Sequence, residues 1–244
     1  MALDSQNLPQ HVSIIMDGNR RWAREQGKLA AEGHRYVVDN VIEPLVDHCI
    51  ELGIPYLTLW AFSTENWDRD KAELQAMMKL FRYGLGKKVD RLHEKGVKLN
   101  VLGELDKFPE DIAKQSRQMM ELTKDNDQIT VTFALNYGGR DEIIRAANRY
   151  LTAKMEELEN AAEGEEVEFG FFEEDFGEFL DTAGMPDPDL IIRPGGQLRL
   201  SGFMPWQSVY AELYFTDVLM PDFSIEQFDA ALEDYQNRQR RFGR

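Results

Sequence analysis

One carboxylate is followed along the chain by a cluster of cations. Asp17 ends a short apolar run rich in β-branched residues, and Gly18 and Asn19 beside it are typical turn residues. Arg20 and Arg21 come next, in a segment compatible with a helix. A strand end that leads into a helix favours anions, because backbone N–H groups are free there. The spacing thus indicates a site for a phosphorylated ligand, with Asp17 placed to bind a divalent cation beside it.

The same residues also fit a plainer interpretation. An Asp-Gly-Asn turn after a strand is often only a turn that caps the next helix. Arginines on a surface helix are often only solvated. Spacing alone leaves both interpretations open, because short motifs are weak evidence.

Polar side chains also follow three later predicted strands, at residues 63–67, 136–140 and 193–201. Strand ends of an α/β sheet are where ligands usually bind, so these stretches are further candidates. The sequence contains neither G-x-G-x-x-G nor G-x-x-x-x-G-K-[ST], which excludes the dinucleotide-binding and P-loop classes. It has no G-x-S-x-G nucleophile elbow and no histidine pair with zinc spacing.

The chain is acidic, with 244 residues and a net charge of −16. A nucleic-acid-binding protein normally carries a basic face, so we expect no nucleic-acid partner. The single cysteine, Cys49, excludes an intrachain disulfide and suits a reducing compartment. No apolar run approaches the roughly 18 residues of a membrane span, and we see no secretory signal. These features predict a soluble cytoplasmic protein.

Apolar runs alternate with turn residues along the chain and predict an α/β fold. Strands are expected at residues 12–16, 56–62, 97–102, 129–135, 189–193 and 210–215. Helices are expected at 37–52, 71–95, 109–122, from the turn at 136–140 to about 160, and at 224–242, with an acidic loop at 163–178 leading into a short helix. Pro44 should kink or break the helix 37–52. We predict one domain, 1–244, with a mainly parallel six-stranded sheet flanked by helices.

The predicted helix 71–95 has an unusual apolar stripe that includes Met77, Met78, Phe81 and Leu85. Methionine and phenylalanine at helical spacing are usually core residues. The same stripe could also line an apolar tunnel, and the pattern does not decide between the two.

Four sequence blocks resemble the cis-prenyltransferase family, which includes undecaprenyl diphosphate synthase and the dolichyl-type long-chain synthases. The blocks are HVSIIMDGNRRWA, FSTENW, NYGGR and IIRPGGQLRLSGFMPWQSVYAELYF, and they occur in that order. The resemblance runs from about His11 to Gly243. The spellings DGNRRWA and PDPDLIIR look closer to archaeal members than to the usual bacterial DGNGRWA form.

The resemblance implies a Mg²⁺-dependent enzyme that condenses isopentenyl diphosphate onto an allylic prenyl diphosphate and makes a long-chain Z-polyprenyl diphosphate. An apolar tunnel would accept the growing chain. Asp17 resembles the catalytic, Mg²⁺-binding aspartate of the family. The residues that would bind the allylic diphosphate are Gly18, Asn19, Arg20, Arg21, Trp22 and His34.

The resemblance also implies roles for residues later in the chain. The segment expected to close over the substrate contains Ser63, Glu65, Trp67 and the catalytic Asn66, with Arg69 just after it. The residues expected to bind isopentenyl diphosphate are Arg193, Arg199 and Ser201. Arginine suits these sites because its planar fork pairs with phosphate oxygens.

Two further elements imply a homodimer. Glu212 resembles a second metal-binding carboxylate that is supplied across the dimer interface. Arg241, Phe242 and Gly243 resemble a C-terminal R-x-G element that reaches the partner's site. The lipid product also makes peripheral contact with a membrane plausible.

Three positions depart from the family pattern. Residues 194–197 read Pro-Gly-Gly-Gln where Thr-Ser/Gly-Gly-Glu is usual, so Gln197 removes a carboxylate. Ala30 replaces a common diphosphate-binding arginine, and Val37 replaces a glycine. Arg20 could restore the missing charge. Besides chain elongation, these departures leave open a homologue with an altered donor or acceptor that gives short or unusual products, or a non-catalytic partner subunit.

Overall fold

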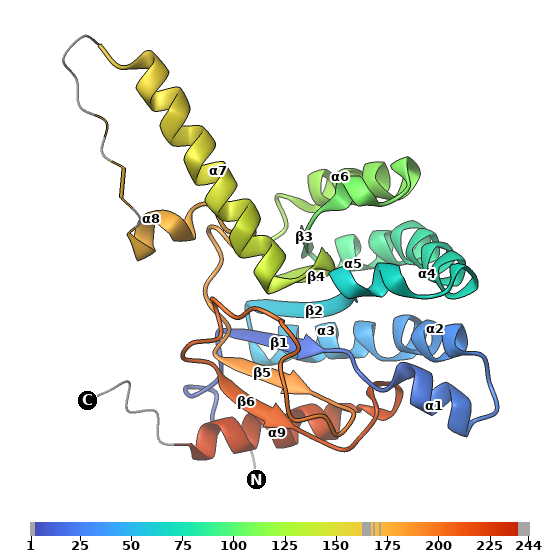
Figure 1. Ribbon diagram of the computed structural model, residues 1–244. Coiled ribbons are helices and arrows are strands. Elements are labelled where there is room, and N and C mark those ends of the chain that lie inside the picture. The colour runs from blue at the N-terminus through green and yellow to red at the C-terminus, as the bar shows by residue number, and fades with distance from the viewer. Residues whose placement is uncertain (1–2, 163–166, 168, 171, 239–244) are drawn as a thin grey trace.

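The centre of the fold is one parallel sheet of six strands, in the order β3-β4-β2-β1-β5-β6 (Figure 1). The computed structural model describes residues 3–162, 167, 169–170 and 172–238. The strands are β1 (His11–Ile15), β2 (Tyr56–Ser63), β3 (Val97–Leu102), β4 (Ile129–Tyr137), β5 (Leu190–Arg193) and β6 (Glu212–Phe215). The predicted α/β class and six-stranded parallel sheet are confirmed.

The strand β1 lies between β2 and β5, with Val12 opposite both Leu57 and Leu190. All of its residues are buried, because elements cover both faces of a parallel sheet. The loop that follows β1 is therefore flanked by the ends of β2 and β5. This position is where ligands usually bind in such sheets.

Helices pack on both faces of the sheet (Figure 1). They are α1 (Asn19–Glu25), α2 (Ala30–Asn40), α3 (Ile42–Leu52), α4 (Lys71–Tyr83), α5 (Val89–Glu94), α6 (Glu110–Thr123), α7 (Gly139–Asn160), α8 (Glu173–Gly177) and α9 (Ile225–Asn237). The main apolar core joins the sheet to side chains of α2, α3, α5, α6 and α9. The helix α7 projects beyond the rest of the molecule in Figure 1.

Two of the predicted helices are wrong in detail. The expected helix 37–52 is two helices, α2 and α3, and α2 begins already at Ala30. The break falls at Val41, and Pro44 lies in the first turn of α3, where a missing N–H costs nothing. The expected helix 71–95 is interrupted by a π-helical turn, Gly84–Lys88, between α4 and α5.

The ends of the chain differ less from expectation. The predicted C-terminal helix is α9, which ends at Asn237, and residues 239–244 lie outside the described part. The predicted acidic loop 163–178 is described only in part, and α8 is its short helix.

Cys49 is fully buried in the core, as its position on an apolar stripe predicted. Across the described residues, we find no helix with the length and apolarity needed to cross a membrane.

Candidate active site

Asp17 and Arg193 lie at the ends of neighbouring strands. Asp17 comes just after β1, and Arg193 is the last residue of β5. Arg193 Nη2 donates a hydrogen bond to Asp17 Oδ2 at 3.0 Å. The Arg193 side chain is 6% exposed and that of Asp17 is 31% exposed. The guanidinium is thus fixed inside the protein while the carboxylate remains reachable from outside.

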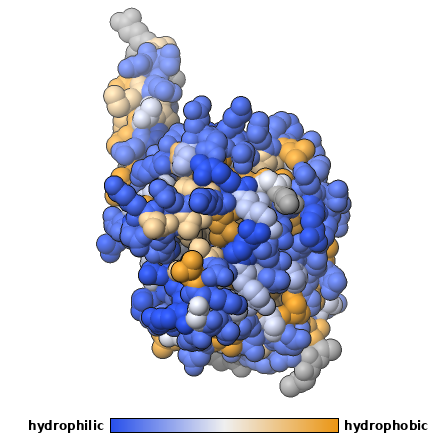
Figure 2. Space-filling model, turned by 90° about the vertical axis from the view of Figure 1, so that its right-hand side faces the viewer, coloured by the Kyte–Doolittle hydropathy of each residue, from blue (hydrophilic) through white to orange (hydrophobic). Residues whose placement is uncertain are grey.

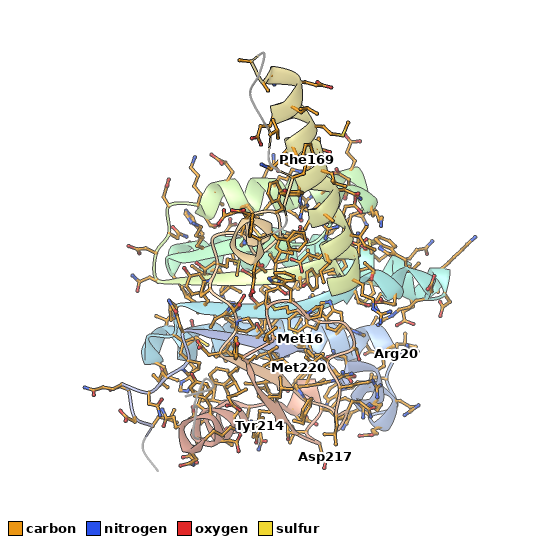
Figure 3. All side chains as sticks on the ribbon, turned by 60° about the vertical axis from the view of Figure 1, so that its left-hand side comes forward. Met16, Arg20, Phe169, Tyr214, Asp217 and Met220 are labelled. Carbon is orange, nitrogen blue, oxygen red and sulfur yellow. The ribbon has the colours of Figure 1, made fainter. Side chains whose placement is uncertain are left out.

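The loop after β1 turns sharply around Asp17. Gly18 has φ 103°, a left-handed conformation that glycine adopts without strain, and its N–H donates to Asp17 Oδ1 at 2.6 Å. Arg21, in the first turn of α1, lies 3.4 Å from the same oxygen. Met220 N donates to the Asp17 carbonyl at 3.0 Å. Figure 3 labels Met16, which precedes Asp17, together with Met220 and Arg20. The carboxylate is therefore held by backbone and by two cations.

The loop after β5 approaches this turn closely because of a glycine. Gly195 has φ 93°, and a Cβ at this position would lie 2.6 Å from Arg21 Nη2 and 3.3 Å from the Asp17 carbonyl carbon. Any larger residue would push the two loops apart. The family pattern has serine or glycine at this position, and the glycine of this chain suits the close contact between the two loops.

Arg193 is oriented by its own loop. Its Nη1 donates to Ser201 Oγ at 2.9 Å and to the carbonyl of Arg199. Its Nε is buried and, within the described residues, has no hydrogen-bond partner. Asn19 Oδ1 is in the same state. Buried polar atoms are normally paired, so these two atoms are candidates for contacts with a ligand.

A second group of charges surrounds Glu73 of α4. Arg69 Nη1 lies 2.9 Å from Glu73 Oε1, and Arg20 Nε lies 3.6 Å from the same oxygen. The pKa of His34 is lowered mainly by burial, with Arg69 and Arg20 adding to the effect. Sequence reasoning missed Glu73. The spacing of Arg69 and Glu73, four residues apart at a helix start, was the available signal.

The segment after β2 forms a 3₁₀ turn, Thr64–Asp68. Ser63 and Asn66 close it reciprocally, because Asn66 Nδ2 donates to Ser63 Oγ at 2.9 Å and Ser63 N donates to Asn66 Oδ1 at 3.2 Å. Trp67 Nε1 donates to Asn136 Oδ1 at 2.7 Å. This last bond ties the turn to β4 and keeps Ser63 and Asn66 at the sheet edge.

A cavity of about 470 Å³ opens between these groups. We call the titratable lining residues near the strand ends, Asp17, His34, Arg69, Arg193 and Arg199, the mouth. Beyond the mouth the lining is mostly apolar and includes Ala61, Met77, Phe81 and Leu85. Met77 and Phe81 thus line a cavity, whereas Met78 is buried in the neighbouring apolar cluster. Figure 2 views the edge where the strands end, and most of its surface is hydrophilic.

The predicted site residues separate into groups. Nine line the cavity: Asp17, Asn19, His34, Ser63, Asn66, Arg69, Arg193, Arg199 and Ser201. Six lie beside it without lining it: Gly18, Arg20, Arg21, Trp22, Glu65 and Trp67. Arg241 and Gly243 lie outside the described residues.

Two of the predicted residues have other partners in this chain. The Trp22 side chain is 6% exposed, and its Nε1 donates a hydrogen bond to Asp222 Oδ1 at 2.8 Å. Trp22 is thus packed inside the protein. Glu212 is the first residue of β6, at the end of the sheet opposite Asp17, and pairs with Arg238 at 2.7 Å. The fold of one chain therefore does not bring Glu212 to Asp17.

A metal ion at this site would need ligands from elsewhere. Within the described residues, no group of three or more His, Cys, Asp or Glu side chains could hold one. Asp17 offers one partly exposed carboxylate among cations. This fits Mg²⁺, which binds through one or two carboxylates together with substrate phosphates and water.

Comparisons with known proteins agree with this geometry. The family model described as "Putative undecaprenyl diphosphate synthase" matches residues 15–243. An isoprenyl transferase of Clostridium perfringens is 44% identical over 100% of this chain and 93% of its own length. Lavandulyl diphosphate synthase from Lavandula x intermedia, solved with dimethylallyl diphosphate, has a TM-score of 0.88 at 33% identity, covering 98% of this chain and 100% of its own. A protein described as a probable undecaprenyl diphosphate synthase from Campylobacter jejuni has a TM-score of 0.76 at 31% identity, with coverage of 98% and 100%.

The parallel sheet, the cationic mouth and the apolar cavity define an enzyme of the isoprenyl transferase class. The chain belongs to the undecaprenyl diphosphate synthase family, that of the cis-prenyltransferases. The predicted family and enzyme class are confirmed. The closer likeness to archaeal members remains a prediction.

Proposed function

We propose that this protein is a Mg²⁺-dependent cis-prenyltransferase that condenses isopentenyl diphosphate onto an allylic prenyl diphosphate. The product would be a long-chain Z-polyprenyl diphosphate, a precursor of lipid carriers. The observation that carries the proposal is the cavity, which joins a charged mouth to an apolar interior of about 470 Å³ in total. A diphosphate with a hydrocarbon tail is the chemistry that such a cavity suits.

The mouth offers separate positions for two diphosphates. The first turn of α1, with Asn19, Arg20 and Arg21, would bind the allylic diphosphate beside Asp17. Arg193 with its buried Nε, together with Arg199 and Ser201, would bind isopentenyl diphosphate. Arginine forks pair with phosphate oxygens better than ammonium groups do.

The reaction needs charge stabilisation and positioning more than proton chemistry. The allylic C–O bond breaks and its electron pair leaves with the diphosphate. The isopentenyl double bond attacks the resulting allylic cation, and loss of a proton forms the Z double bond. Mg²⁺ bound at Asp17 would supply neutralising charge for the diphosphate. Arg21 and Asn66 would fix the reacting ends in line, which is the main source of rate in such a site.

We also propose a homodimer in which Glu212 serves the partner's metal site. Within one chain Glu212 lies at the opposite end of the sheet from Asp17, so a role at a metal site would require a second chain. Arg241 and Gly243 would reach the partner's site in the same assembly. A cytoplasmic location and peripheral contact with a membrane through the lipid product belong to the same proposal.

One observation favours a second candidate, a homologue that makes short or unusual products. Gln197 Oε1 accepts a hydrogen bond from Arg199 Nη1 at 2.7 Å, where the family pattern has a carboxylate. Ala30 also lacks the usual arginine side chain. A non-catalytic subunit is disfavoured, because such a subunit has no need of Asp17 and Arg193.

Turnover of labelled isopentenyl diphosphate tests these candidates directly. The assay contains Mg²⁺ and a panel of allylic diphosphates of different lengths, and products are separated by chain length. Long Z-chains would support elongation, and one or two additions would support the second candidate. A folded dimer without turnover on any primer would overturn both.

A further inference from the structure

The cavity has charged side chains at two places. One is the mouth. Among the other described lining residues, the charged ones are Glu43 of α3 and Lys88 of the π turn. Apolar residues adjoin them in the lining, Ile42 beside Glu43 and Val89 beside Lys88. The apolar part of the cavity thus has charged residues at a second place, away from the mouth.

These two residues lie far from the mouth along the helices. Glu73, near the start of α4, pairs with Arg69 of the mouth, and Lys88 comes after one further helical segment. At 1.5 Å per residue, Lys88 is about 22 Å beyond Glu73 along this axis. On the facing side, His34 of α2 lines the mouth, and Glu43 lies in the first turn of the next helix, α3. Glu43 and Lys88 therefore lie away from the mouth, in the part of the cavity that Leu92, Leu99 and Met119 also line.

Oppositely charged side chains join the two helical walls in this region. The ion pairs are Lys88–Asp39 at 3.4 Å, Arg91–Glu43 at 2.8 Å, Lys95–Glu43 at 2.9 Å and Lys95–Asp47 at 2.6 Å. We call these six residues the ion-pair seam. Asp39, Glu43 and Asp47 follow one another at four-residue intervals, and their partners lie on the π turn and just after it. The seam therefore runs along both walls.

Glu43 and Lys88 are the most buried charges of the seam, whereas Arg91, Lys95 and Asp47 are more exposed. The side chains of Glu43 and Lys88 are 12% and 17% exposed, so water has little access to them. A hydrocarbon chain that entered the seam would separate charges and offer no hydrogen bond in return. Leaving a buried charge without its partner is strongly unfavourable. A prenyl chain that grows past Glu43 and Lys88 would therefore lose apolar contact on the side of the cavity that these two charged residues line.

The wall just before the seam contains a glycine. Gly84, the first residue of the π turn, lines the cavity, and a Cβ at this position would meet no atom within 4 Å. Gly86 in the same turn also has open space around it but does not line the cavity. Gly84 is thus a position where a side chain would take space from the cavity itself.

We propose that the ion-pair seam, through Glu43 and Lys88, is the stop that limits the length of the prenyl chain, and that Gly84 provides room in front of it. This inference rests on the proposed function, since a stop has meaning only for an enzyme that binds a prenyl chain. It assigns to this chain the residues that select product length.

Lys88→Met tests the stop. Methionine keeps the length of the side chain and removes the charge, so the longest product should gain at least one five-carbon unit. Lys79→Met is the matched control, because it makes the same substitution at an exposed lysine of α4 that belongs neither to the seam nor to the cavity lining. Its products should match those of the wild type. Unchanged products with Lys88→Met, or the same shift in both variants, would overturn the proposal.

Gly84→Leu tests the opposite direction. The leucine side chain should fill the space before the seam and shorten the longest product by at least one unit. Gly86→Leu introduces the same residue into the same turn outside the cavity lining, and its products should not change. Thermal unfolding followed by circular dichroism shows whether each variant is folded. Full-length products from a folded Gly84→Leu variant would contradict the assignment.

Binding of unreactive n-alkyl diphosphates separates the stop from the reaction. Affinity should rise with each added methylene until the chain reaches the seam, and then level off. The plateau should begin at longer chains in Lys88→Met and at shorter chains in Gly84→Leu. A moved plateau would support the stop even if the wild type gave no turnover, a result that would defeat only the proposed function. A plateau at one length in all three proteins would refute the stop.

Discussion

Asp17 and Arg193 are 176 residues apart in the sequence, yet their side chains meet at 3.0 Å at the ends of adjacent parallel strands. The arginine is buried and the aspartate is partly exposed. A diphosphate bound here must therefore share the guanidinium with the carboxylate. This contact links the two proposed substrate positions.

Asp17→Ala should nearly abolish turnover. The change removes the carboxylate that would bind Mg²⁺, and we expect a loss of at least about 10²-fold, the range for a single electrostatic group at a reacting centre. Arg193 retains Ser201 and the Arg199 carbonyl as partners, so the fold should survive. Steady-state kinetics and circular dichroism measure both effects. Glu25→Ala, which removes an exposed carboxylate of α1, is the control and should keep the wild-type rate. A wild-type rate in Asp17→Ala would contradict the role of Asp17 as a metal ligand.

Trp22→Phe should affect stability and leave catalysis unchanged. The ring packs against Tyr36 with centroids 4.8 Å apart, and phenylalanine keeps an aromatic ring there while it removes the indole hydrogen bond to Asp222. We expect the free energy of unfolding to fall by about 1 kcal/mol, as measured by urea denaturation. KM for the allylic diphosphate should not change, because the Trp22 side chain is buried and packs against Tyr36. A large rise in this KM would instead show that Trp22 binds substrate.

Gln197→Glu should weaken binding of isopentenyl diphosphate. A carboxylate would pair with Arg199 more strongly than the amide does, and so compete with the diphosphate. An additional 1 kcal/mol in this pair corresponds to a KM about five-fold higher, with kcat nearly constant. Arg199→Gln should raise the same KM further. An unchanged or lower KM in Gln197→Glu would mean that Arg199 does not bind this substrate.

Mixed dimers test whether Glu212 acts across an interface. Asp17→Ala and Glu212→Ala chains should each be inactive alone. When they are unfolded together and refolded, about half of the dimers are mixed, and each has one site with both carboxylates intact. Activity should therefore return to about a quarter of the wild-type value. No recovery, in a preparation that light scattering shows to be dimeric, would exclude the shared site.

Acid should destabilise the protein through His11. The ring is buried, its Nδ1–H donates to the Pro186 carbonyl at 2.7 Å, and its Nε2 accepts from Thr58 Oγ at 2.8 Å. Burial lowers the pKa of His11 to about 4. In the unfolded chain the group binds a proton near pH 6.5, so between these values the unfolded state holds more protons. The free energy of unfolding should therefore be fully retained above this window and fall by roughly 3 kcal/mol as the pH decreases through it.

His11→Gln isolates this contribution. Urea denaturation at pH 7 and pH 4.5 gives the loss of stability for each protein. The variant should lose less than the wild type over this interval, because the titrating group is gone. Equal losses would show that other groups account for the acid sensitivity.

Local patterns in the sequence were sufficient to predict the sheet. The apolar runs that became β1 and β5 bury every residue, and the run that became β2 buries half of its residues. Their short length and the turn residues that bound them favour strands over helices. Asp17 and Arg193 could be chosen as site residues for the same reason, since both come at strand ends. Family resemblance then supplied roles that spacing alone left open.

Helix boundaries depended on packing that the sequence does not display. The helix α2 packs so closely on α1 that a Cβ on Gly33 would lie 2.1 Å from the Asn19 carbonyl, and no periodicity reveals this contact. The π turn at Gly84–Lys88 likewise interrupts a pattern that reads as one continuous helix.

The tertiary structure also decided which charged residues share a site. Glu73 pairs with Arg69 of the mouth, and Trp22 bonds to Asp222. Glu212 lies at the opposite end of the sheet from Asp17. Spacing along a chain fixes neighbours within an element. Contacts between elements depend on strand order and on the side from which each loop approaches, and these become fixed only when the whole core packs.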